Sequence, residues 1–378
     1  MKICILGPAH PLRGGLASFN ERLAEQFQNE GHEVNILTFS LQYPTLLFPG
    51  KTQYSTAEKP RHLRIDSVVN SINPLNWIKT ARLINKQKPD MLIVRYWTPF
   101  MAPCLGSICR WVSKKKFTKV ICLVDNLIPH EKHFFDRIFT QYFVKGIHGF
   151  VTMSKSVYQD VIDLKIKAPI ALTPHPMFDN FGEATFRHTA IEKLDLDSEY
   201  RYFLYFGLIR GYKGLDWLIE AFADERLRKF PYKLIIAGEF YEDSKPYFDL
   251  IKKYQLEEHI VLRTEFIPND LVPFYFSASD LLVLPYKDAT QSGVTQIAYH
   301  FNKPMLVTNV GGLPEIVIDQ VSGYVVDPKI EAISNAMVQF AENNNPDHFL
   351  TGILKEKQRF EWNKMTQAFL ELRVKSEE

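Results

Sequence analysis

Two basic side chains stand three residues apart in a glycine-containing segment, residues 207–214, that follows a short apolar run. Arg210 offers a planar fork of hydrogen-bond donors, and Lys213 offers a compact positive charge. The glycines at both ends of the segment leave backbone N–H groups accessible to an anion. These groups are suited to holding a diphosphate, although a segment of this composition also occurs as a solvated surface turn.

A second glycine-containing loop lies near the start of the chain. Gly14 and Gly15 precede a helical pattern of apolar residues, so bare amide groups are expected at a helix N-terminus, where the helix dipole favours an anion. A permissive turn between a strand and a helix explains the same glycines. The loop lacks the G-x-G-x-x-G spacing, and no acidic residue follows the next strand, which disfavours a dinucleotide-dependent dehydrogenase.

Polar residues follow other apolar runs. Asp125 and His130 come after the run 120–124, and Glu239 comes after the run 234–237. Ligands of open α/β sheets bind beyond the carboxyl ends of the strands, so each of these side chains is a candidate contact to a sugar or a nucleotide. Asp125 could equally cap a turn, and His130 could be an ordinary surface residue.

Two further segments place polar groups ahead of helical patterns. The backbone amides of Ser292, Gly293 and Val294 precede a helix and can hold a phosphate. Gln291 can hydrogen-bond a ribose or a sugar. Glu315 is a candidate contact to the nucleotide or the sugar, or a carboxylate that only stabilises the first turn of a helix.

No cluster of His, Asp and Glu residues has the spacing of a metal site, so no metal ligands are predicted. The four cysteines are expected to be reduced packing residues. Cys4 and Cys122 lie inside apolar runs, and the spacing of Cys104 and Cys109 matches no zinc pattern.

These candidate residues must be positioned by strands and helices. Short apolar runs separated by helix-period segments recur at 3–6, 34–38, 91–94, 120–124 and 150–153, then at 203–206, 234–237, 260–262, 281–284, 305–308 and 324–326. Continuous apolar strands that alternate with helices predict parallel sheets covered on both faces. Two such series predict two doubly wound, Rossmann-like α/β domains that face each other across a ligand-binding cleft. An aperiodic stretch at 173–199 is expected to link them, and helical spacing over 355–373 predicts one long C-terminal amphipathic helix.

Composition fits this organisation. The chain has 378 residues, of which 46% are hydrophobic, enough to build two domain cores. No apolar run approaches the roughly 20 residues that span a bilayer, and the apolar start is too short for a signal peptide. A cytoplasmic location is therefore expected.

Charge is divided unequally along the chain. Residues 1–180 hold 23 Lys and Arg against 13 Asp and Glu, whereas residues 181–378 hold 22 against 30. A basic first half is expected to face an anionic partner such as a phosphate or a membrane surface. The segment 104–119, which contains three consecutive lysines, could lie on an anionic membrane or be an ordinary helix whose lysines complement its dipole. Nucleic acid is disfavoured, because no nucleic-acid-binding module accompanies the basic residues.

Four fragments, in this order, resemble the retaining glycosyltransferases of family 4. They are the Gly14-Gly15 loop with residues 31–34, the segment 207–222, the Gly-Gly-Leu-Pro-Glu sequence at 311–315, and residues 323–326. Each fragment is weak alone, but together they extend over nearly the whole chain. The resemblance implies a GT-B fold. In that fold, residues 1–180 form a Rossmann-like acceptor domain, residues 181–355 form a Rossmann-like donor domain for a nucleotide sugar, and residues 356–378 form a helix that packs back on the first domain.

The resemblance also implies roles for single residues. Arg210 and Lys213 resemble the pair that stabilises the leaving diphosphate in this family, although the family's arginine more often stands where this chain has Leu208. Asp125 takes the place of the family's histidine. The turn at Ile267 resembles the one whose backbone meets the base.

One departure concerns the family's paired glutamates. The place of the second glutamate is held by Ile297 or Ala298, so the usual carboxylate contact to the ribose is in doubt. Glu315 resembles the family residue that contacts ribose or sugar. The amides at 292–294 and the side chain of Gln291 remain donor-binding candidates.

The resemblance therefore implies a metal-independent, retaining hexosyltransferase that moves a sugar from a UDP- or GDP-sugar to a saccharide or a lipid-linked glycan, as in polysaccharide or glycan biosynthesis. The nucleotide sugar is a co-substrate, and no cofactor is expected. The protein would be cytoplasmic, either free or bound peripherally to the inner face of the membrane. The alternatives are an inactive GT-B scaffold or regulatory subunit, to which the lost glutamate points, and a nucleotide-sugar 2-epimerase.

Overall fold

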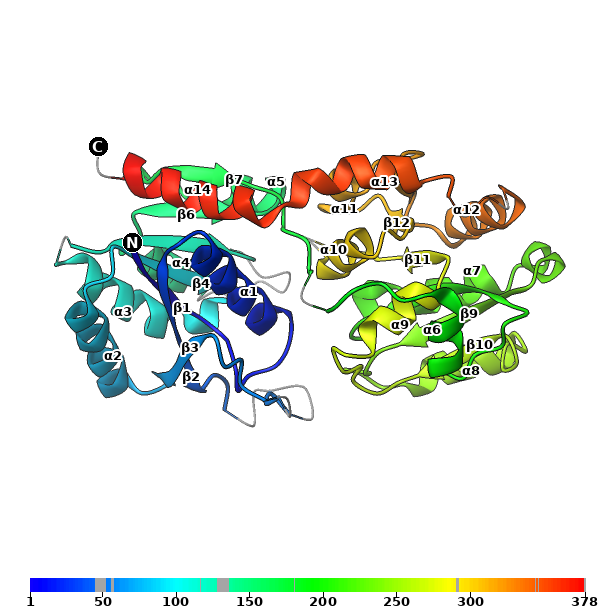
Figure 1. The fold of residues 1–378 in the computed structure, drawn as a ribbon, viewed down its shortest axis with the longest axis horizontal. Coiled ribbons are helices and arrows are strands. Elements are labelled where there is room, and N and C mark those ends of the chain that lie inside the picture. Colours follow the sequence, from blue (N-terminus) through cyan, green and yellow to red (C-terminus); the bar gives the residue numbers. More distant parts are fainter. Residues whose placement is uncertain are drawn as a thin grey trace. The chain divides into compact units, whose positions relative to one another are not determined.

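The computed structural model describes residues 1–44, 52–55, 58–115, 117–127, 136–179, 181–289, 292–343, 345 and 347–376. The chain divides into two compact units: unit 1 comprises Met1–His175 and Glu361–Glu378, and unit 2 comprises Pro176–Phe360. Each unit is built around a parallel sheet flanked by helices (Figure 1). The predicted fold class, two parallel-sheet α/β units of the Rossmann type, is confirmed.

In the described part of unit 1, the strands lie in the order β3-β2-β1-β4-β5-β6-β7, and all neighbouring pairs are parallel. The strands are β1 (Lys2–Leu6), β2 (Glu33–Leu41), β3 (Arg64–Asn70), β4 (Met91–Tyr96), β5 (Lys119–Val124), β6 (Gly149–Thr152) and β7 (Ile170–Leu172). The helices are α1 (Gly15–Asn29), α2 (Pro74–Gln87), α3 (Ala102–Ser113), α4 (Asp136–Val144), α5 (Lys155–Asp163) and α14 (Trp362–Lys375), with a 3-10 turn η2 (Pro99–Met101). The helices α2, α3 and α4 pack in series, whereas α14 packs on α1 and on β5, β6 and β7.

In the described part of unit 2, the parallel strand order is β10-β9-β8-β11-β12-β13. The strands are β8 (Arg201–Phe206), β9 (Tyr232–Ala237), β10 (Ile260–Arg263), β11 (Leu281–Leu284), β12 (Met305–Thr308) and β13 (Gly323–Val326). The helices are α6 (Arg187–Lys193), α7 (Leu215–Phe222), α8 (Lys245–Lys253), α9 (Val272–Ala278), α10 (Gly293–His300), α11 (Leu313–Ile316), α12 (Ile330–Asn343) and α13 (Leu350–Glu356). Three 3-10 turns complete it: η3 (Gly211–Lys213), η4 (Glu225–Lys229) and η5 (Lys357–Phe360).

Central strands coincide with the apolar runs of the sequence because both of their faces are covered. Every residue of β4 is buried, and β1 and β5 are buried apart from their first residues. The two edge strands of unit 1, β3 and β7, were not predicted. In β3 only Ile65 and Val69 are buried, and the strand carries Arg64 and Asp66. β7 has only three residues, so neither strand forms a continuous apolar run.

The expected link over residues 173–199 is too long. The chain passes from unit 1 to unit 2 between His175 and Pro176, and α6 lies inside the stretch that was expected to be irregular. This helix is short, and it belongs to unit 2 because it packs on α9. Seven helical residues with two buried positions give too little periodicity for a sequence-based prediction.

The single long helix expected over 355–373 is also wrong. Residues Lys357–Phe360 form a 3-10 turn, Glu361 is extended, and α14 begins at Trp362. The break has a packing cause. The ring of Phe360 lies against Tyr299, and its carbonyl accepts a hydrogen bond of 2.9 Å from Met177 N–H, both in unit 2. Trp362 packs on Phe19 in unit 1, so the break in the helix coincides with the boundary between the two units.

The cysteine prediction is confirmed, since all four cysteines are free and buried in the core of unit 1. Burial raises the pKa of each thiol, which keeps it protonated and unreactive near neutral pH. Among the described residues, no helix is both long enough and apolar enough to cross a membrane.

Candidate active site

The basic loop of unit 2 is a tight 3-10 turn at the carboxyl end of β8. Arg210 is the extended residue before η3, and Lys213 is its last residue. Gly214 follows with a φ of 69°, and a Cβ at this position would lie 2.0 Å from the carbonyl oxygen of Pro285. Only glycine allows this approach, which brings the loop against the residues that follow β11.

Two contacts fix the backbone of this loop. The carboxylate of Glu242 accepts a hydrogen bond of 2.7 Å from Gly211 N–H and a second one from the Tyr247 hydroxyl. The carbonyl of Tyr212 accepts a hydrogen bond of 2.7 Å from Lys287 N–H. The turn that carries the two basic side chains is therefore held in one conformation.

The side chain of Lys213 is half-buried and has no compensating charge among the described residues. Within the described ranges, its ammonium group has no hydrogen-bond or ion-pair partner, and it lies 5.6 Å from the centre of the Tyr286 ring. Burial, and secondarily the positive charge of Arg210, lower the pKa of Lys213 to about 8. A desolvated cation of this kind is poised to bind an anion.

Gly207 connects this lysine with the start of α10. A Cβ on Gly207 would lie 3.6 Å from Lys213 Nζ and 3.4 Å from Val294 Cγ2. Ser292, the N-cap residue of α10, makes no capping hydrogen bond, and its hydroxyl instead shares a hydrogen bond of 3.2 Å with Tyr286. Gly207 thus lies close to both Lys213 Nζ and the side chain of Val294 in the first turn of α10, whereas Gln291 lies outside the described residues.

One buried side chain of α10 is left unsatisfied. Gln296 is fully buried, and neither its amide oxygen nor its amide nitrogen has a hydrogen-bond partner in the described part of the chain. Ile297 and Ala298, at the place of the lost glutamate, are buried too. This turn of the helix therefore offers an amide, and no carboxylate, to its surroundings.

The other donor-binding candidates of unit 2 lie at the carboxyl ends of neighbouring strands. Glu239 is buried two residues after the end of β9, and its carbonyl accepts a hydrogen bond of 2.9 Å from Ile209 N–H. Glu315 is half-buried in α11. The loop before α11 packs on the segment before α10, because a Cβ on Gly311 would overlap the carbonyl of Ala289. Ile267 is half-buried in the turn between β10 and α9.

In unit 1, the glycine loop is open. Gly14 and Gly15 are exposed at the start of α1. Among the described residues, no side chain caps that helix, and a Cβ on either glycine would meet no atom within 4 Å. Free amides at an uncapped helix start suit an anion. The two glycines therefore stand where the sequence analysis expected them, at the exposed N-terminus of a helix.

Asp125 lies directly after β5 and is bound by an arginine that the sequence analysis missed. Arg95 donates from Nε and Nη2 to the two carboxylate oxygens of Asp125, at 2.7 and 2.6 Å, and from Nη1 to Asn20 at 3.2 Å. The guanidinium also stacks on Phe19, 4.2 Å from its ring centre. An arginine inside an otherwise apolar strand was the available signal, because a buried guanidinium needs a carboxylate. His130 lies outside the described residues.

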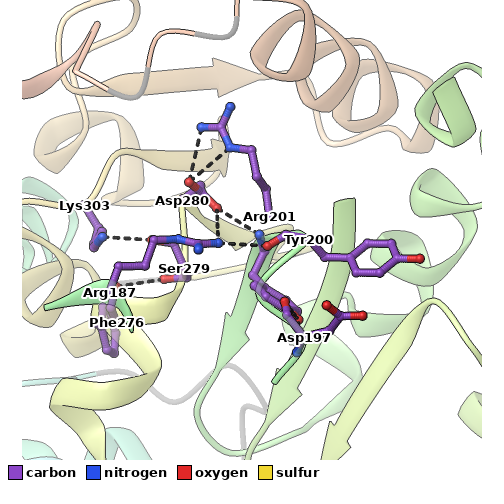
Figure 2. Close-up of polar contacts among 9 residues, drawn as sticks. Arg187, Asp197, Tyr200, Arg201, Phe276, Ser279, Asp280 and Lys303 are labelled. Carbon is purple, nitrogen blue, oxygen red and sulfur yellow. Dashed lines mark hydrogen bonds and ion pairs between the residues drawn. The ribbon is translucent and has the colours of Figure 1, made fainter. Parts of the chain in front are cut away.

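The opposite end of the unit 2 sheet carries a different polar cluster, shown in Figure 2. Asp280, just before β11, accepts hydrogen bonds from the Arg201 side chain at 3.2 Å and from Tyr202 N–H at 2.9 Å, and lies 4.0 Å from Arg187. Arg187 also donates to the carbonyl of Tyr200 at 2.8 Å. Each of these groups is satisfied within the unit, so the cluster ties α6, β8 and β11 together.

An Asp-x-Asp sequence, Asp195-Leu196-Asp197, precedes β8 at this same end of the sheet. The Asp197 side chain accepts a hydrogen bond of 3.0 Å from Glu199 N–H, and its backbone is hydrogen-bonded to the Tyr202 hydroxyl. It forms a turn, distant from the carboxyl ends of the strands. Across the described residues, no group of three His, Cys, Asp or Glu side chains is arranged to hold a metal ion.

The basic segment 104–119 comprises most of α3 and the turn after it. Lys114 and Lys115 are exposed beyond the end of the helix, and Phe117 is 55% exposed, whereas Lys116 lies outside the described residues. The apolar face of α3 is buried in the unit 1 core. This end of unit 1 therefore presents cations and one aromatic ring to solvent.

Both parts of the chain match models of known protein families. Residues 13–177 match the model described as Glycosyltransferase Family 4, and residues 186–356 match the model described as Glycosyl transferases group 1. An uncharacterized glycosyltransferase of Methanocaldococcus jannaschii is 25% identical over 364 residues, which cover 87% of this chain and 86% of that protein.

Solved structures share the fold. Sucrose-phosphate synthase from Thermosynechococcus elongatus matches with a TM-score of 0.75 at 16% identity and covers 100% of both chains. Anabaena HepE, solved in complex with UDP-glucose, matches with a TM-score of 0.74 at 15% identity and covers 98% of each chain.

Proposed function

Since the chain belongs to the GT-B glycosyltransferases of family 4, we propose that it transfers a sugar from a UDP- or GDP-sugar to a saccharide or lipid-linked glycan acceptor, with retention of configuration and without a metal ion. The product would be a growing polysaccharide or another glycan. The bound UDP-glucose of Anabaena HepE supports a nucleotide sugar as the donor class.

The half-buried ammonium group of Lys213, which has no partner among the described residues, carries this proposal. When the bond between the anomeric carbon and the diphosphate breaks, the electron pair goes to the leaving phosphate oxygen, and negative charge develops there. Lys213 and Arg210 supply positive charge to those oxygens, and the N–H groups of residues 292–294 supply hydrogen bonds. The lowered pKa of Lys213 reflects a charge that the free protein does not compensate and that a diphosphate would compensate.

Retention follows from an attack on the face that the diphosphate leaves. The acceptor hydroxyl oxygen forms the new bond to the anomeric carbon, and its proton passes to the departing phosphate oxygen. This chemistry needs no protein nucleophile. Two cationic side chains at the diphosphate take the electrostatic role that a divalent ion has elsewhere, which supports metal independence.

The remaining candidates contact the donor or the acceptor. In unit 2, Glu315 and Glu239 would bind ribose or sugar hydroxyls, and the backbone at Ile267 would meet the base. In unit 1, the Gly14-Gly15 amides would bind the donor's phosphates, and Asp125, held by Arg95, would accept a hydrogen bond from a sugar hydroxyl.

Location is part of the same proposal. A lipid-linked acceptor would place the enzyme in the cytoplasm at the inner face of the membrane, with Lys114 and Lys115 beside anionic headgroups. Salt-sensitive binding to anionic vesicles that is lost when residues 114–116 become Gln would support this contact. Unchanged binding would show that these lysines only complement the α3 dipole.

Thermal unfolding with a panel of nucleoside diphosphates tests the donor site. A ligand at a hundred times its Kd stabilises the native state by ~2.7 kcal/mol, so UDP or GDP should raise Tm selectively. Lys213→Ala should abolish the shift. Lys245→Ala is a matched control, because this exposed lysine of unit 2 is paired with Asp249 at 2.8 Å. No shift with any nucleotide in a folded protein would contradict the proposal.

The apolar Ile297 and Ala298 give the inactive scaffold a specific observation in its favour. A scaffold would bind the nucleotide and release no free diphosphate from any donor sugar. A 2-epimerase would also bind it but would change the sugar without an acceptor. Product analysis with each nucleotide sugar, with and without EDTA, separates these outcomes and tests metal independence at once.

A further inference from the structure

The loop that follows β9 lies against the basic loop that follows β8. The two strands are neighbours in the sheet, and a glycine stands directly after each of them. Gly207 N–H donates to the Ala237 carbonyl at 2.9 Å, and a Cβ on Gly238, whose φ is 152°, would lie 2.0 Å from the Gly207 carbonyl oxygen. Only glycine at position 238 lets the two loops approach this closely.

Residues 239–242, which we call the backing segment, continue this contact. Ile209 N–H donates to the Glu239 carbonyl at 2.9 Å, and Tyr241 N–H donates to the Ile209 carbonyl at 3.0 Å. Between these two bonds, Ile209 and Phe240 form a parallel bridge. The bridge extends the pairing of β8 and β9 past the ends of both strands, as far as the residue before the basic turn.

Contacts with α8 and with η3 hold the backing segment in place. The ring of Phe240 packs on Tyr247, with ring centres 5.4 Å apart, and on Phe248 at 6.0 Å. Glu242 accepts hydrogen bonds from the Tyr247 hydroxyl and from Gly211 N–H, so it joins α8 to the basic turn. The segment is therefore fixed to a helix of unit 2 on one side and to η3 on the other.

The guanidinium of Arg210 lies over the ring of Tyr241. Its central carbon is 5.2 Å from the ring centre, which is the distance of a cation–π contact. Both side chains are half-buried, and among the described residues Arg210 has no hydrogen-bond or ion-pair partner. A carboxylate would occupy the N–H donors of the guanidinium, whereas a ring face attracts the cation and leaves those donors unbonded.

We propose that Tyr241 is a positioning residue of the donor site, which holds the Arg210 guanidinium where it binds the diphosphate of the nucleotide sugar. Arg210 stands beyond the bridge at Ile209, so no strand neighbour directs its side chain, and the ring supplies that direction. This inference rests on the proposed function, because Arg210 is one of its two cations. Tyr241 acts through Arg210 and does not touch the substrate.

Pre-organisation is the physical basis of this role. An arginine side chain that is free in solvent loses rotamer freedom when it binds an anion, and that loss weakens binding. A ring that already restricts the guanidinium removes part of this cost. The strength of one cation–π contact at a half-buried site corresponds to about threefold to tenfold in Kd.

Diphosphate binding by ring variants tests the role of Tyr241. The probes are UDP and GDP, and isothermal titration calorimetry on the full-length protein measures the Kd of each. Tyr241→Phe keeps the ring and should bind as wild type does, whereas Tyr241→Leu keeps only an apolar side chain and should bind about threefold to tenfold more weakly. Equal loss in both variants would show that the hydroxyl matters, and wild-type binding by both would show that the ring does not. Either result overturns the proposal.

A double-mutant cycle assigns the effect to Arg210. In an Arg210→Ala background, Tyr241→Leu should cause no further loss of affinity, because the ring acts only through the guanidinium. A loss of the same size in both backgrounds would mean that Tyr241 contacts the nucleotide itself or only supports the fold. That result would overturn the positioning role.

Tyr200→Leu is the matched control. Tyr200, labelled in Figure 2, is half-buried directly before β8, and Lys233 Nζ lies 4.2 Å from its ring centre. This variant removes the same kind of contact at the amino end of the sheet and should leave the Kd for UDP and GDP unchanged. If Tyr200→Leu lost as much affinity as Tyr241→Leu, the effect would not be specific to Arg210, and the proposal would fail.

The same measurements separate this inference from the proposed function. If neither UDP nor GDP binds to the wild-type protein, the proposed function fails, and the inference fails with it. If Arg210→Ala binds as tightly as wild type, the diphosphate role of the arginine is wrong. If Arg210→Ala binds more weakly but Tyr241→Leu does not, the donor site stands and only the positioning role of Tyr241 is wrong.

Discussion

The two ends of the unit 2 sheet treat basic side chains in opposite ways. At the amino end, Arg187 and Arg201 surround the carboxylate of Asp280, and Figure 2 shows this closed cluster. At the carboxyl end, Arg210 and Lys213 share one turn, and within the described residues neither has a carboxylate partner. The same residue types are neutralised at one end of the strands and left uncompensated at the other.

The paired arginines at the amino end stabilise the fold, whereas the unpaired cations at the carboxyl end are available to bind a ligand. Lys213 has a pKa of about 8 in the folded protein, below the 10.5 of an ordinary lysine. Between these two pH values the unfolded chain holds a proton that the folded protein has released, so the free energy of unfolding rises with pH there. Below pH 8 the partly desolvated, unpaired ammonium group lowers the free energy of unfolding. A protein that keeps such a charge needs it for another purpose, and binding a diphosphate is the proposed one.

Removing the uncompensated cation should produce the largest effect. Lys213→Ala is expected to raise the barrier to sugar transfer by ~2–4 kcal/mol, the range for losing one preorganised charge contact. It should slightly stabilise the fold at neutral pH, because an unpaired, partly desolvated charge is gone. Initial rates at saturating nucleotide sugar measure the first effect, and denaturant unfolding measures the second. If this variant kept the wild-type rate, the unpaired cation at the carboxyl end of the sheet would have no functional role that the paired cations at the amino end lack.

Breaking the paired cluster should give the opposite pattern. Asp280→Ala leaves two arginines without their carboxylate and is expected to destabilise unit 2 by about 2–3 kcal/mol, less than for a fully buried pair because Arg187 is 40% exposed. Nucleotide binding to the folded variant should be unchanged. Asp249→Ala, which breaks an exposed pair on α8, should have an effect near zero. Lost nucleotide affinity in a folded Asp280→Ala protein would show that the amino end belongs to the site.

The pH dependence of nucleotide binding sharpens the comparison further. Above about pH 8, Lys213 is neutral in the free protein, so binding a diphosphate must return a proton to it. The Kd for UDP or GDP should therefore rise with pH, by up to about tenfold per pH unit. Calorimetry in buffers of different ionisation enthalpy measures the proton uptake. Lys213→Ala should take up no proton. If the Kd of the wild-type protein did not change between pH 7 and 10, the pKa of Lys213 would lie outside that range.

Sequence patterns predicted what depends on local runs and missed what depends on strand order. Apolar runs predicted the buried central strands. Arg210 and Lys213 could be predicted because both lie in one short segment that resembles a family motif. Arg95 and Asp125 are far apart along the chain, and they meet only because β4 and β5 are neighbours. Contact between Arg210 and the ring of Tyr241 requires β8 and β9 to be neighbours, which no local pattern encodes.

The smallest expected effect concerns a carboxylate that lies close to the basic loop without pairing to it. Glu242 accepts from the N–H of Gly211 and from Tyr247, so its role is to hold the turn and not to neutralise Lys213. Glu242→Gln keeps an acceptor oxygen and should leave the rate near wild type. Glu242→Ala frees the amide and should raise the KM for the nucleotide sugar severalfold through a loosened loop. If Glu242→Gln were as impaired as Glu242→Ala, the negative charge itself would matter. The carboxyl end would then be partly compensated, as the amino end is.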